Sequence, residues 1–345
     1  MRVAIVGAGI MGASTARFLA ARGTEVTVFE QFEPGHAMGS SHGRSRIVRK
    51  AYPDAFYTEI MQEGYPMWAE LEAEAGEAIL HECGLLYFGK ADSADIVSVA
   101  EGLKANGVDF ETLDSRDVGR VFPGLRLDPD EVGIWTPEAG WVHAERAVRA
   151  SLRIAQGHGA RVVQRRIEEL EPLEVEFDAV VLTPGGWVSK FVELDVVVQA
   201  RTFAYLQAHQ SGPVWIDDAP GLHYGFPSEP CGDTIKIGGH IRGGNFDPDR
   251  PDRPVDPANV EAIRELAARR FGLSDAKVVE SAMCLYTRTP DEDFRIGRLS
   301  DKTVYASPCS GHGFKFGPWV GKYLADLAEG KREATAFPRF ARVSS

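Results

Sequence analysis

The sequence is poor in cysteine and contains no closely spaced cysteine pair. Its 345 residues include four cysteines, Cys83, Cys231, Cys284 and Cys309, and none of them belongs to a C-x-x-C motif. Zinc sites and disulfide frameworks both need such clustering. We therefore expect neither of them, and we predict no metal site.

Long apolar runs, a basic leader and an excess of positive charge are also missing. No hydrophobic stretch is long enough to cross a bilayer, and the chain opens with an apolar strand pattern at 2–6, which favours the cytoplasm. Lys and Arg number 38 against 50 Asp and Glu, a formal charge of -12 that argues against non-specific binding to nucleic acid. We expect a small-molecule substrate, no nucleic-acid or membrane partner, and a monomer or small homo-oligomer.

The composition that is present is that of a globular protein with a sizeable core. Hydrophobic residues make up 44% of the chain and charged residues 26%. The length is compatible with two ordinary domains or one large one.

The first thirty residues read as strand, tight turn, helix and strand: RVAIVGAG, IMGASTARFLAARG and TEVTVFE. Gly7, Gly9 and Gly12 form a GxGxxG motif between strand and helix, where glycines permit the turn, the close approach of a pyrophosphate and helix–strand packing. Glu30 ends the second strand, where a carboxylate accepts hydrogen bonds from an adenosine ribose and disfavours a 2′-phosphate. The motif predicts FAD or NAD and does not separate the two.

The rest of the chain alternates between helical and strand patterns. Helices are predicted at 56–74, 93–106, 144–156, 257–271 and 317–328. Strands are predicted at 85–88, 160–163, 179–183, 282–286 and 304–307, with an antiparallel sheet between 201 and 239. The segment 31–46, rich in Gly, Ser and His, is predicted to be an extended loop that wraps a ligand.

These patterns predict an α/β fold in which a Rossmann-like nucleotide domain carries an inserted antiparallel-sheet substrate domain. The expected nucleotide domain is discontinuous and comprises 1–83, 141–196 and 287–345. The expected substrate domain comprises 84–140 and 197–286.

Four further stretches resemble the monomeric sarcosine oxidase and N-methyltryptophan oxidase family, FAD-dependent amine oxidoreductases of the D-amino acid oxidase superfamily. They are SSHGRSRIVRKAY from Ser40, YGFP with IKIGGH between Tyr224 and His240, AMCLYTRTPDEDF from Ala282, and SGHGFKF from Ser310. The resemblance extends along nearly the whole chain. It implies an FAD-containing oxidase whose flavin ring lies between the two domains.

The resemblance places Cys284 where the family attaches a cysteine sulfur to the flavin, so it implies covalent FAD. For an arbitrary cysteine the ordinary interpretation is a small buried hydrophobe in a strand. We apply that interpretation to Cys83, Cys231 and Cys309.

The same resemblance implies a set of residues around the flavin and substrate. Arg49 and Lys315 would hold a substrate carboxylate, and Tyr224 and Tyr286 would line the amine pocket. Lys236 would lie near flavin N5 and stabilise developing superoxide, with Arg46, His42 and His240 as further catalytic residues. The expected cofactor-binding residues are Gly7, Gly9, Ile10, Met11, Gly12, Glu30, Ser41, His42, Arg46, Cys284, Gly311, Gly313, Phe314 and Lys315.

The implied reaction is oxidation of a secondary amine or N-methyl amino acid, with hydride transfer to the flavin and reoxidation by O2 to give H2O2. Three alternatives stay open at this point. They are an NAD-dependent dehydrogenase, a flavin enzyme with another electron acceptor, and a non-catalytic flavin-binding sensor. The motifs do not choose among sarcosine, N-methyltryptophan, pipecolate, proline or a more specialised amine.

Overall fold

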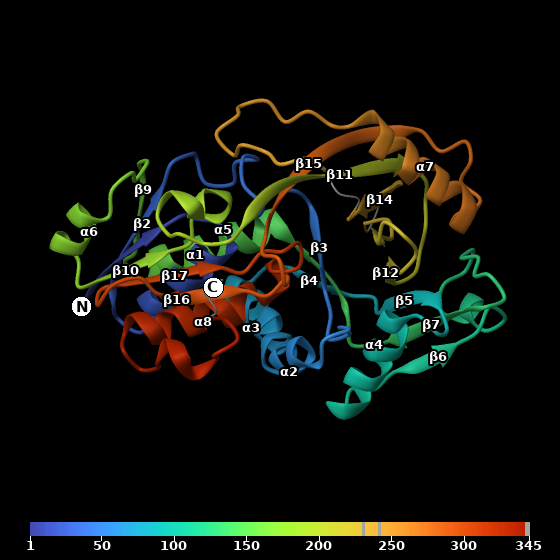
Figure 1. Ribbon diagram of the computed structural model, residues 1–345, viewed down its shortest axis with the longest axis horizontal. Coiled ribbons are helices and arrows are strands. Elements are labelled where there is room, and N and C mark those ends of the chain that lie inside the picture. Colours follow the sequence, from blue (N-terminus) through green and yellow to red (C-terminus); the bar gives the residue numbers. More distant parts are fainter. Residues whose placement is uncertain (230–231, 241–242, 342–345) are drawn as a thin grey trace.

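The computed structural model describes residues 1–229, 232–240 and 243–341, and its strands form three sheets (Figure 1). The six-stranded sheet has the order β16-β17-β10-β1-β2-β9. Its strands are β1 (Arg2–Val6), β2 (Glu25–Glu30), β9 (Arg161–Gln164), β10 (Ala179–Leu182), β16 (Arg295–Arg298) and β17 (Thr303–Ser307). Neighbouring strands from β9 to β17 pair in parallel, and β16 adds an antiparallel edge.

Strand β1 lies in the middle of this sheet and is buried on both faces. Val3 and Ile5 pack into the core shared with the helices α1 (Ile10–Ala21), α5 (Ala144–Gly157) and α8 (Gly317–Ala328), whereas Ala4 and Val6 pack into the core on the opposite face. Continuous apolar sequence is what a parallel strand covered on both faces requires. Helices α2 (Ala55–Gly64) and α3 (Pro66–Ala75) extend the first core, and α6 (Glu171–Glu176) and the 3-10 helix η2 (Gly185–Lys190) extend the second.

The eight-stranded sheet has the order β15-β11-β14-β13-β12-β5-β7-β6. Its strands are β5 (Leu85–Lys90), β6 (Glu111–Leu113), β7 (Glu131–Thr136), β11 (Val197–Gln207), β12 (Val214–Asp217), β13 (His223–Phe226), β14 (Thr234–Gly239) and β15 (Val278–Arg288). Helix α7 (Pro257–Phe271) packs on one face and α4 (Ala94–Ala105) on the other. In Figure 1 the long strands β11 and β15 run across the molecule from the half that carries β1 and β2 toward α7.

A third, three-stranded sheet combines β3 (Ser45–Val48), β8 (Gly140–His143) and β4 (Leu80–Glu82) in the order β3-β8-β4. Short 3-10 helices lie at η1 (Val118–Arg120), η3 (Phe314–Phe316) and η4 (Ala334–Ala336). No described helix is both long and apolar enough to span a membrane.

The predicted α/β architecture is confirmed, with differences of detail. The helix predicted at 56–74 is two helices, because Pro66 has no N–H to continue the hydrogen-bond ladder of α2. The sheet predicted as antiparallel contains one parallel pair, in which β12 joins β5 and thereby links segments distant in sequence. Strands β3, β4, β6, β8 and β16 were not predicted individually, because three or four residues show no periodicity of their own, and the six-residue β7 was not predicted either.

Candidate functional site

A small cavity of about 100 Å³ lies at the carboxyl ends of β1, β2 and β10. The loop Gly7–Gly9 after β1, the end of β2 and Thr183 after β10 line it, together with the start of the 31–46 loop. In a parallel α/β sheet this edge is where ligands bind.

Close backbone contacts require two of the three motif glycines, Gly7 and Gly12. Gly7 has a φ of +100°, and a Cβ there would lie 2.4 Å from the Thr183 carbonyl oxygen. A Cβ on Gly12 would lie 1.9 Å from the Gly7 carbonyl oxygen, and one on Gly9 would lie 3.1 Å from Ser41 Oγ. A side chain at Gly7 or Gly12 would therefore force the turn apart, whereas Gly9 brings the backbone close to the Ser41 side chain.

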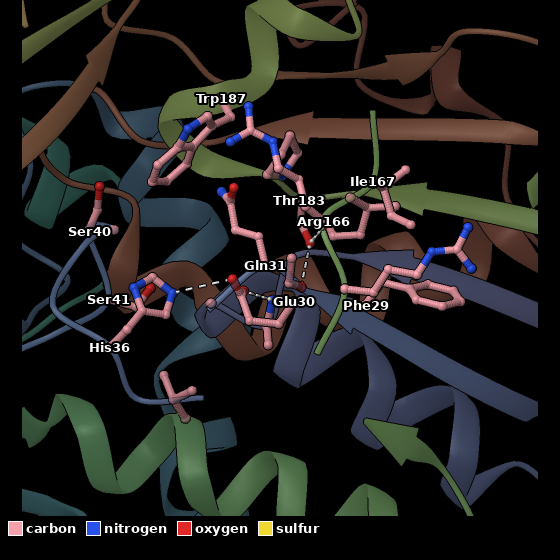
Figure 2. Close-up of a pocket in the computed structure, with 18 of the residues that line it drawn as sticks. Phe29, Glu30, Gln31, His36, Ser40, Ser41, Arg166, Ile167, Thr183 and Trp187 are labelled. Atoms are coloured by element: carbon pink, nitrogen blue, oxygen red, sulfur yellow. Dashed lines mark hydrogen bonds and ion pairs between the residues drawn. The ribbon is translucent and has the colours of Figure 1, made fainter. Parts of the chain in front are cut away.

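Glu30 ends β2 beside the glycine turn and supports it directly. One carboxylate oxygen accepts a hydrogen bond from the Ala8 amide at 2.8 Å, and the other accepts one from the Phe32 amide at 3.1 Å. His36 Nε2 lies 3.5 Å from Glu30, and Figure 2 shows the two side chains pointing toward each other. Although burial opposes ionisation, the contacts with His36 and the two amides lower the pKa of Glu30, so a negative charge faces this cavity.

A second cavity, of about 390 Å³, lies next to the first. Ser40 and Ser41 line both cavities, and Ile10 and Met11, at the N-terminus of α1, line the second. The Ile10 amide donates to Ser41 Oγ at 3.1 Å. The N-terminus of α1, where backbone N–H groups have no partners within the helix, therefore lies between the two cavities.

Five cations line the larger cavity. Arg339 pairs with Asp54 and Asp293, and the sequence predicted the other four as site residues: Arg46, Arg49, Lys236 and Lys315. They come from β3, the residue after β3, β14 and η3. Within the described ranges none of the four forms an ion pair with a carboxylate. Lys236 and Lys315 are buried, and Arg46 and Arg49 are half-buried. Burying cations without counter-ions is costly, so this part of the cavity favours a negatively charged occupant.

Arg46 is held mainly by backbone carbonyls and reaches Cys284. Its Nη2 donates to the Ser40 carbonyl at 2.9 Å and to the His42 carbonyl at 2.7 Å, and it lies 3.8 Å from Cys284 Sγ. Cys284 lines the cavity, and its side chain is buried. The guanidinium therefore lies against the sulfur in the cavity wall.

Arg49 and Lys315 both lie close to the ring of Tyr52. The Arg49 guanidinium carbon is 3.9 Å from the centre of the Tyr52 ring, and Lys315 Nζ is 5.5 Å from it. Lys315 donates one hydrogen bond, to the His312 carbonyl at 2.7 Å. Burial, followed by the charge of Arg49, lowers the pKa of Lys315 well below its ordinary value.

Lys236 is 3% exposed and has little polar contact of its own. Its Nζ donates to the Ser45 carbonyl at 3.0 Å and lies 4.5 Å from the centre of the Phe203 ring. Burial, followed by the charge of Arg46, lowers the pKa of Lys236. An anion entering the cavity would raise it again, because it would supply the missing counter-charge.

Tyr224, Tyr286 and His240 form the neutral part of the lining. The His240 ring centre lies 5.5 Å from the Tyr224 ring centre and 5.3 Å from that of Tyr286. Burial lowers the pKa of His240 to about 3, so its ring is neutral near pH 7. Lys236 and His240 both line the cavity, as strand alternation predicts.

The remaining predicted residues occupy different positions. Gly311, Gly313 and Phe314 line the larger cavity, and a Cβ on Gly311 would lie 2.3 Å from the Tyr286 ring. His42 is buried beside Phe203 and does not line either cavity, and burial lowers its pKa to about 3. Cys231 lies outside the described residues.

Sequence reasoning missed several polar residues of the larger cavity. Tyr52, Thr287 and Ser307 are buried, line the cavity, and have hydroxyls without a hydrogen-bond partner in the described part of the chain. Tyr52 and Thr287 fall inside the stretches that carry the family resemblance. A lone aromatic or hydroxyl residue on an apolar strand is ordinarily a core residue, so nothing else in the sequence distinguished them.

The chain belongs to the FAD-dependent oxidoreductase family, whose model matches residues 2–327. It is 32% identical over 355 residues to the peroxisomal sarcosine oxidase of Mus musculus, with 94% of this chain and 91% of the relative covered. It is 31% identical over 367 residues to the monomeric sarcosine oxidase of Bacillus sp. (strain B-0618), with 96% and 93% covered. The resemblance to the sarcosine oxidase family is thereby confirmed.

The fold is also found among solved structures. NikD, described as an unusual amino acid oxidase essential for nikkomycin biosynthesis, superposes with a TM-score of 0.84 at 24% identity, covering 99% of this chain and 97% of NikD. At this identity the likeness concerns the fold alone. It supports the predicted α/β class.

The residues present fit FAD. The glycine turn and the ionised Glu30 suit an adenosine diphosphate, and the N-terminus of α1 opens between the two cavities. Among the residues that the structure describes, the larger cavity offers four cations without ion-pair partners and buried hydroxyls without hydrogen-bond partners, which a ring rich in carbonyl oxygens and nitrogens would satisfy.

Proposed function

We propose that this chain is an FAD-dependent oxidase of secondary amines that carry a carboxylate, such as N-methyl amino acids of the sarcosine type. The observation that carries the proposal is a group of four cations, none of which pairs with a described carboxylate, around a cavity adjoining the nucleotide cavity. The names of the relatives, sarcosine oxidases at about a third identity, support the same substrate class.

In this proposal the two cavities divide the cofactor and the substrate between them. The smaller cavity would hold the adenosine end of FAD, and the larger one the flavin ring with the substrate. The proposed FAD domain comprises 1–83, 141–196 and 287–345, and the substrate domain 84–140 and 197–286. The division is supported by the strands, because the eight-stranded sheet is built almost entirely from the second set of residues.

Arg49 and Lys315 would fix the substrate carboxylate. A guanidinium binds a carboxylate through two parallel hydrogen bonds, and the ammonium adds a point charge. Arg49 Nη1 is buried and has no hydrogen-bond partner among the described residues, which leaves a donor available for such an anion. Fixing the carboxylate also fixes the amine, so the reacting groups meet in one orientation.

Tyr224, Tyr286 and His240 would surround the amine. These three groups are neutral, and the nearby cations disfavour a further positive charge. The amine would therefore bind with its nitrogen lone pair free. That lone pair forms the C=N bond as a hydride leaves the adjacent carbon, and water later hydrolyses the imine.

When bound, FAD supplies the acceptor for that hydride, and we propose that O2 reoxidises it to give H2O2. Lys236 would stabilise the negative charge that develops on oxygen, with Arg46 as a second nearby cation. His42 would act without contacting the substrate, since it does not line the cavity. The cytoplasmic location and the monomeric or small oligomeric state stay predictions from the sequence.

We further propose that FAD is attached covalently through Cys284. Support comes from its buried position in the cavity wall and from its place in the stretch that resembles the sarcosine oxidase family. After acid precipitation the yellow colour should stay with the wild-type protein and with Cys83→Ser, whereas Cys284→Ser should release it. A denatured wild-type mass without the flavin increment would contradict the linkage.

The function is tested by mixing the purified yellow protein anaerobically with a panel of amines and amino acids. We expect bleaching of the flavin by N-methyl amino acids, and recovery of the colour with H2O2 formation when O2 is added. Bleaching without recovery by O2 would indicate another electron acceptor. Binding without bleaching by any of the amines would indicate a sensor and contradict the proposal.

A further inference from the structure

The two cations of the proposed carboxylate site share one neighbour, Tyr52. Arg49 lies with its guanidinium carbon 3.9 Å from the ring centre, and Lys315 Nζ lies 5.5 Å from the same centre. The π-face of an aromatic ring is negative, so it attracts both cations. No described carboxylate pairs with either cation. The Tyr52 ring therefore helps to hold the positive charges of Arg49 and Lys315 near each other.

The Tyr52 ring is itself fixed by its surroundings. It is 4% exposed, and its centre lies 5.6 Å from both the Tyr57 and the Phe316 ring centres and 5.7 Å from that of His312. Rings packed at these distances leave little room for another orientation. The positions of Arg49 and Lys315 are consequently set by a rigid surface.

The hydroxyl of Tyr52 is the unusual part of the residue. It is buried, and it has no hydrogen-bond partner within the described residues, which is also true of Arg49 Nη1. The neighbouring Tyr57 differs, because its hydroxyl donates to Asp293 Oδ1 at 3.0 Å. Buried donors without acceptors are rare in folded proteins. Two of them on touching side chains that line one cavity indicate an acceptor that binds there.

We propose that Tyr52 completes the carboxylate site: its hydroxyl donates a hydrogen bond to the substrate carboxylate, and its ring positions Arg49 and Lys315. This inference rests on the proposed function, since it assumes that the anion bound in the cavity is a substrate carboxylate. A carboxylate has acceptor sites enough for the guanidinium, the ammonium and a phenol together. Burial raises the pKa of Tyr52, so the phenol keeps its proton and acts as a donor.

The experiment measures binding of acetate, an unreactive carboxylate, to the flavin-loaded protein through the change in flavin absorbance. Tyr52→Phe keeps the ring and removes only the hydroxyl, and we expect acetate to bind about tenfold more weakly or worse. Tyr52→Leu removes the ring as well and should weaken binding further. Tyr323→Phe is the matched control, because Tyr323 is a buried tyrosine on α8 that does not line the cavity, and it should bind acetate like wild type.

The melting temperature without acetate separates a binding role from a structural one. Because the Tyr52 hydroxyl has no described partner in the free protein, Tyr52→Phe should melt no lower than wild type. Wild-type acetate affinity in Tyr52→Phe would overturn the inference and leave the proposed function standing. A wild-type protein that binds no carboxylate in the cavity would overturn both.

Discussion

Buried cations at two places in this chain differ in whether carboxylates neutralise them. Arg270, on α7, is 1% exposed and is neutralised on two sides: its Nη1 donates to Glu131 at 2.6 Å and its Nε to Asp217 at 2.7 Å. Lys236, at the cavity, is 3% exposed and has one carbonyl contact. An uncompensated buried charge is costly. The ion pairs of Arg270 therefore stabilise the fold, whereas the charge of Lys236 would be compensated by a bound ligand.

The pKa shifts follow the same division. Burial alone would lower the pKa of Arg270, but its hydrogen bonds with Glu131 and Asp217 raise it above the ordinary value. Burial lowers the pKa of Lys236 and of Lys315, and no described carboxylate offsets it by direct contact. Substitution of a cation that has ion-pair partners should therefore reduce stability, whereas substitution of a cation without them should reduce activity.

The largest expected effect is on folding, at Arg270. Arg270→Met would leave buried Glu131 without its partner and buried Asp217 with only the exposed Arg269, and it should lower the free energy of unfolding by about 3 to 5 kcal/mol. Arg264→Met is the control, because Arg264 is an exposed arginine on the same helix and should change stability by less than about 0.5 kcal/mol. Denaturant melts of both variants check this. An equally small loss for Arg270→Met would contradict the comparison.

The next effect is on substrate use, at the cavity. Arg49→Ala or Lys315→Ala should cost about 2 to 4 kcal/mol in kcat/KM for a carboxylate substrate, because each removes a charge-assisted contact from a partly dry site. Stability should not fall by a comparable amount, since neither residue pairs with a described carboxylate. The control is Arg44→Ala, an exposed arginine from the same stretch that pairs with Glu280. Unchanged kcat/KM in both cavity variants would rule out the clamp.

Lys236 should show a loss confined to one half of the reaction. Lys236→Met removes a preorganised charge, and we expect flavin reoxidation by O2 to slow by about 10²-fold or more. Flavin reduction by substrate should slow much less. Stopped-flow mixing measures the two steps separately, with the exposed Lys322→Met as control. Equal losses in both steps would assign Lys236 to placement of the ring instead.

The smallest effect is a pH dependence of stability that comes from Glu131. Burial would raise its pKa, but hydrogen bonding to Arg270 holds it below the ordinary value. A lowered pKa in the folded state adds stability above the unfolded pKa of about 4.3, and this is lost as the pH falls through the folded value, with a slope of at most about 1.4 kcal/mol per pH unit. Unfolding midpoints between pH 3 and 6 should show this loss in wild type and not in Arg270→Met.

Much of the fold could be predicted from local sequence because the elements carry their own signals. Helix α7 has the predicted bounds, since Asp256 caps its first turn, proline occupies its first position and Gly272 ends it with a φ of +68°. The β3-β8-β4 sheet could not be predicted, because β3 and β8 pair across about ninety residues and neither strand is long enough to show a period.

The two cavities differ in the same respect. The nucleotide cavity depends on a contiguous glycine turn whose spacing is visible in one line of sequence. The cation cavity is assembled from β3, β14, β15 and η3, and only the family resemblance brought these segments together before the structure did. The family resemblance was not sufficient for Tyr52. It covers the stretch that contains this residue, but the proposed role follows only from the contacts of Tyr52 with Arg49 and Lys315.

The most direct test of the account is whether the substrate carboxylate decides flavin reduction. Sarcosine and dimethylamine share a secondary amine with an N-methyl group, and only sarcosine carries a carboxylate. Anaerobic stopped-flow should show rapid bleaching of wild type by sarcosine, little bleaching by dimethylamine, and a rate with Arg49→Ala that approaches the dimethylamine rate. Equal bleaching of wild type by both amines, or undiminished bleaching of Arg49→Ala by sarcosine, would contradict the claim that the unpaired cations bind a substrate carboxylate.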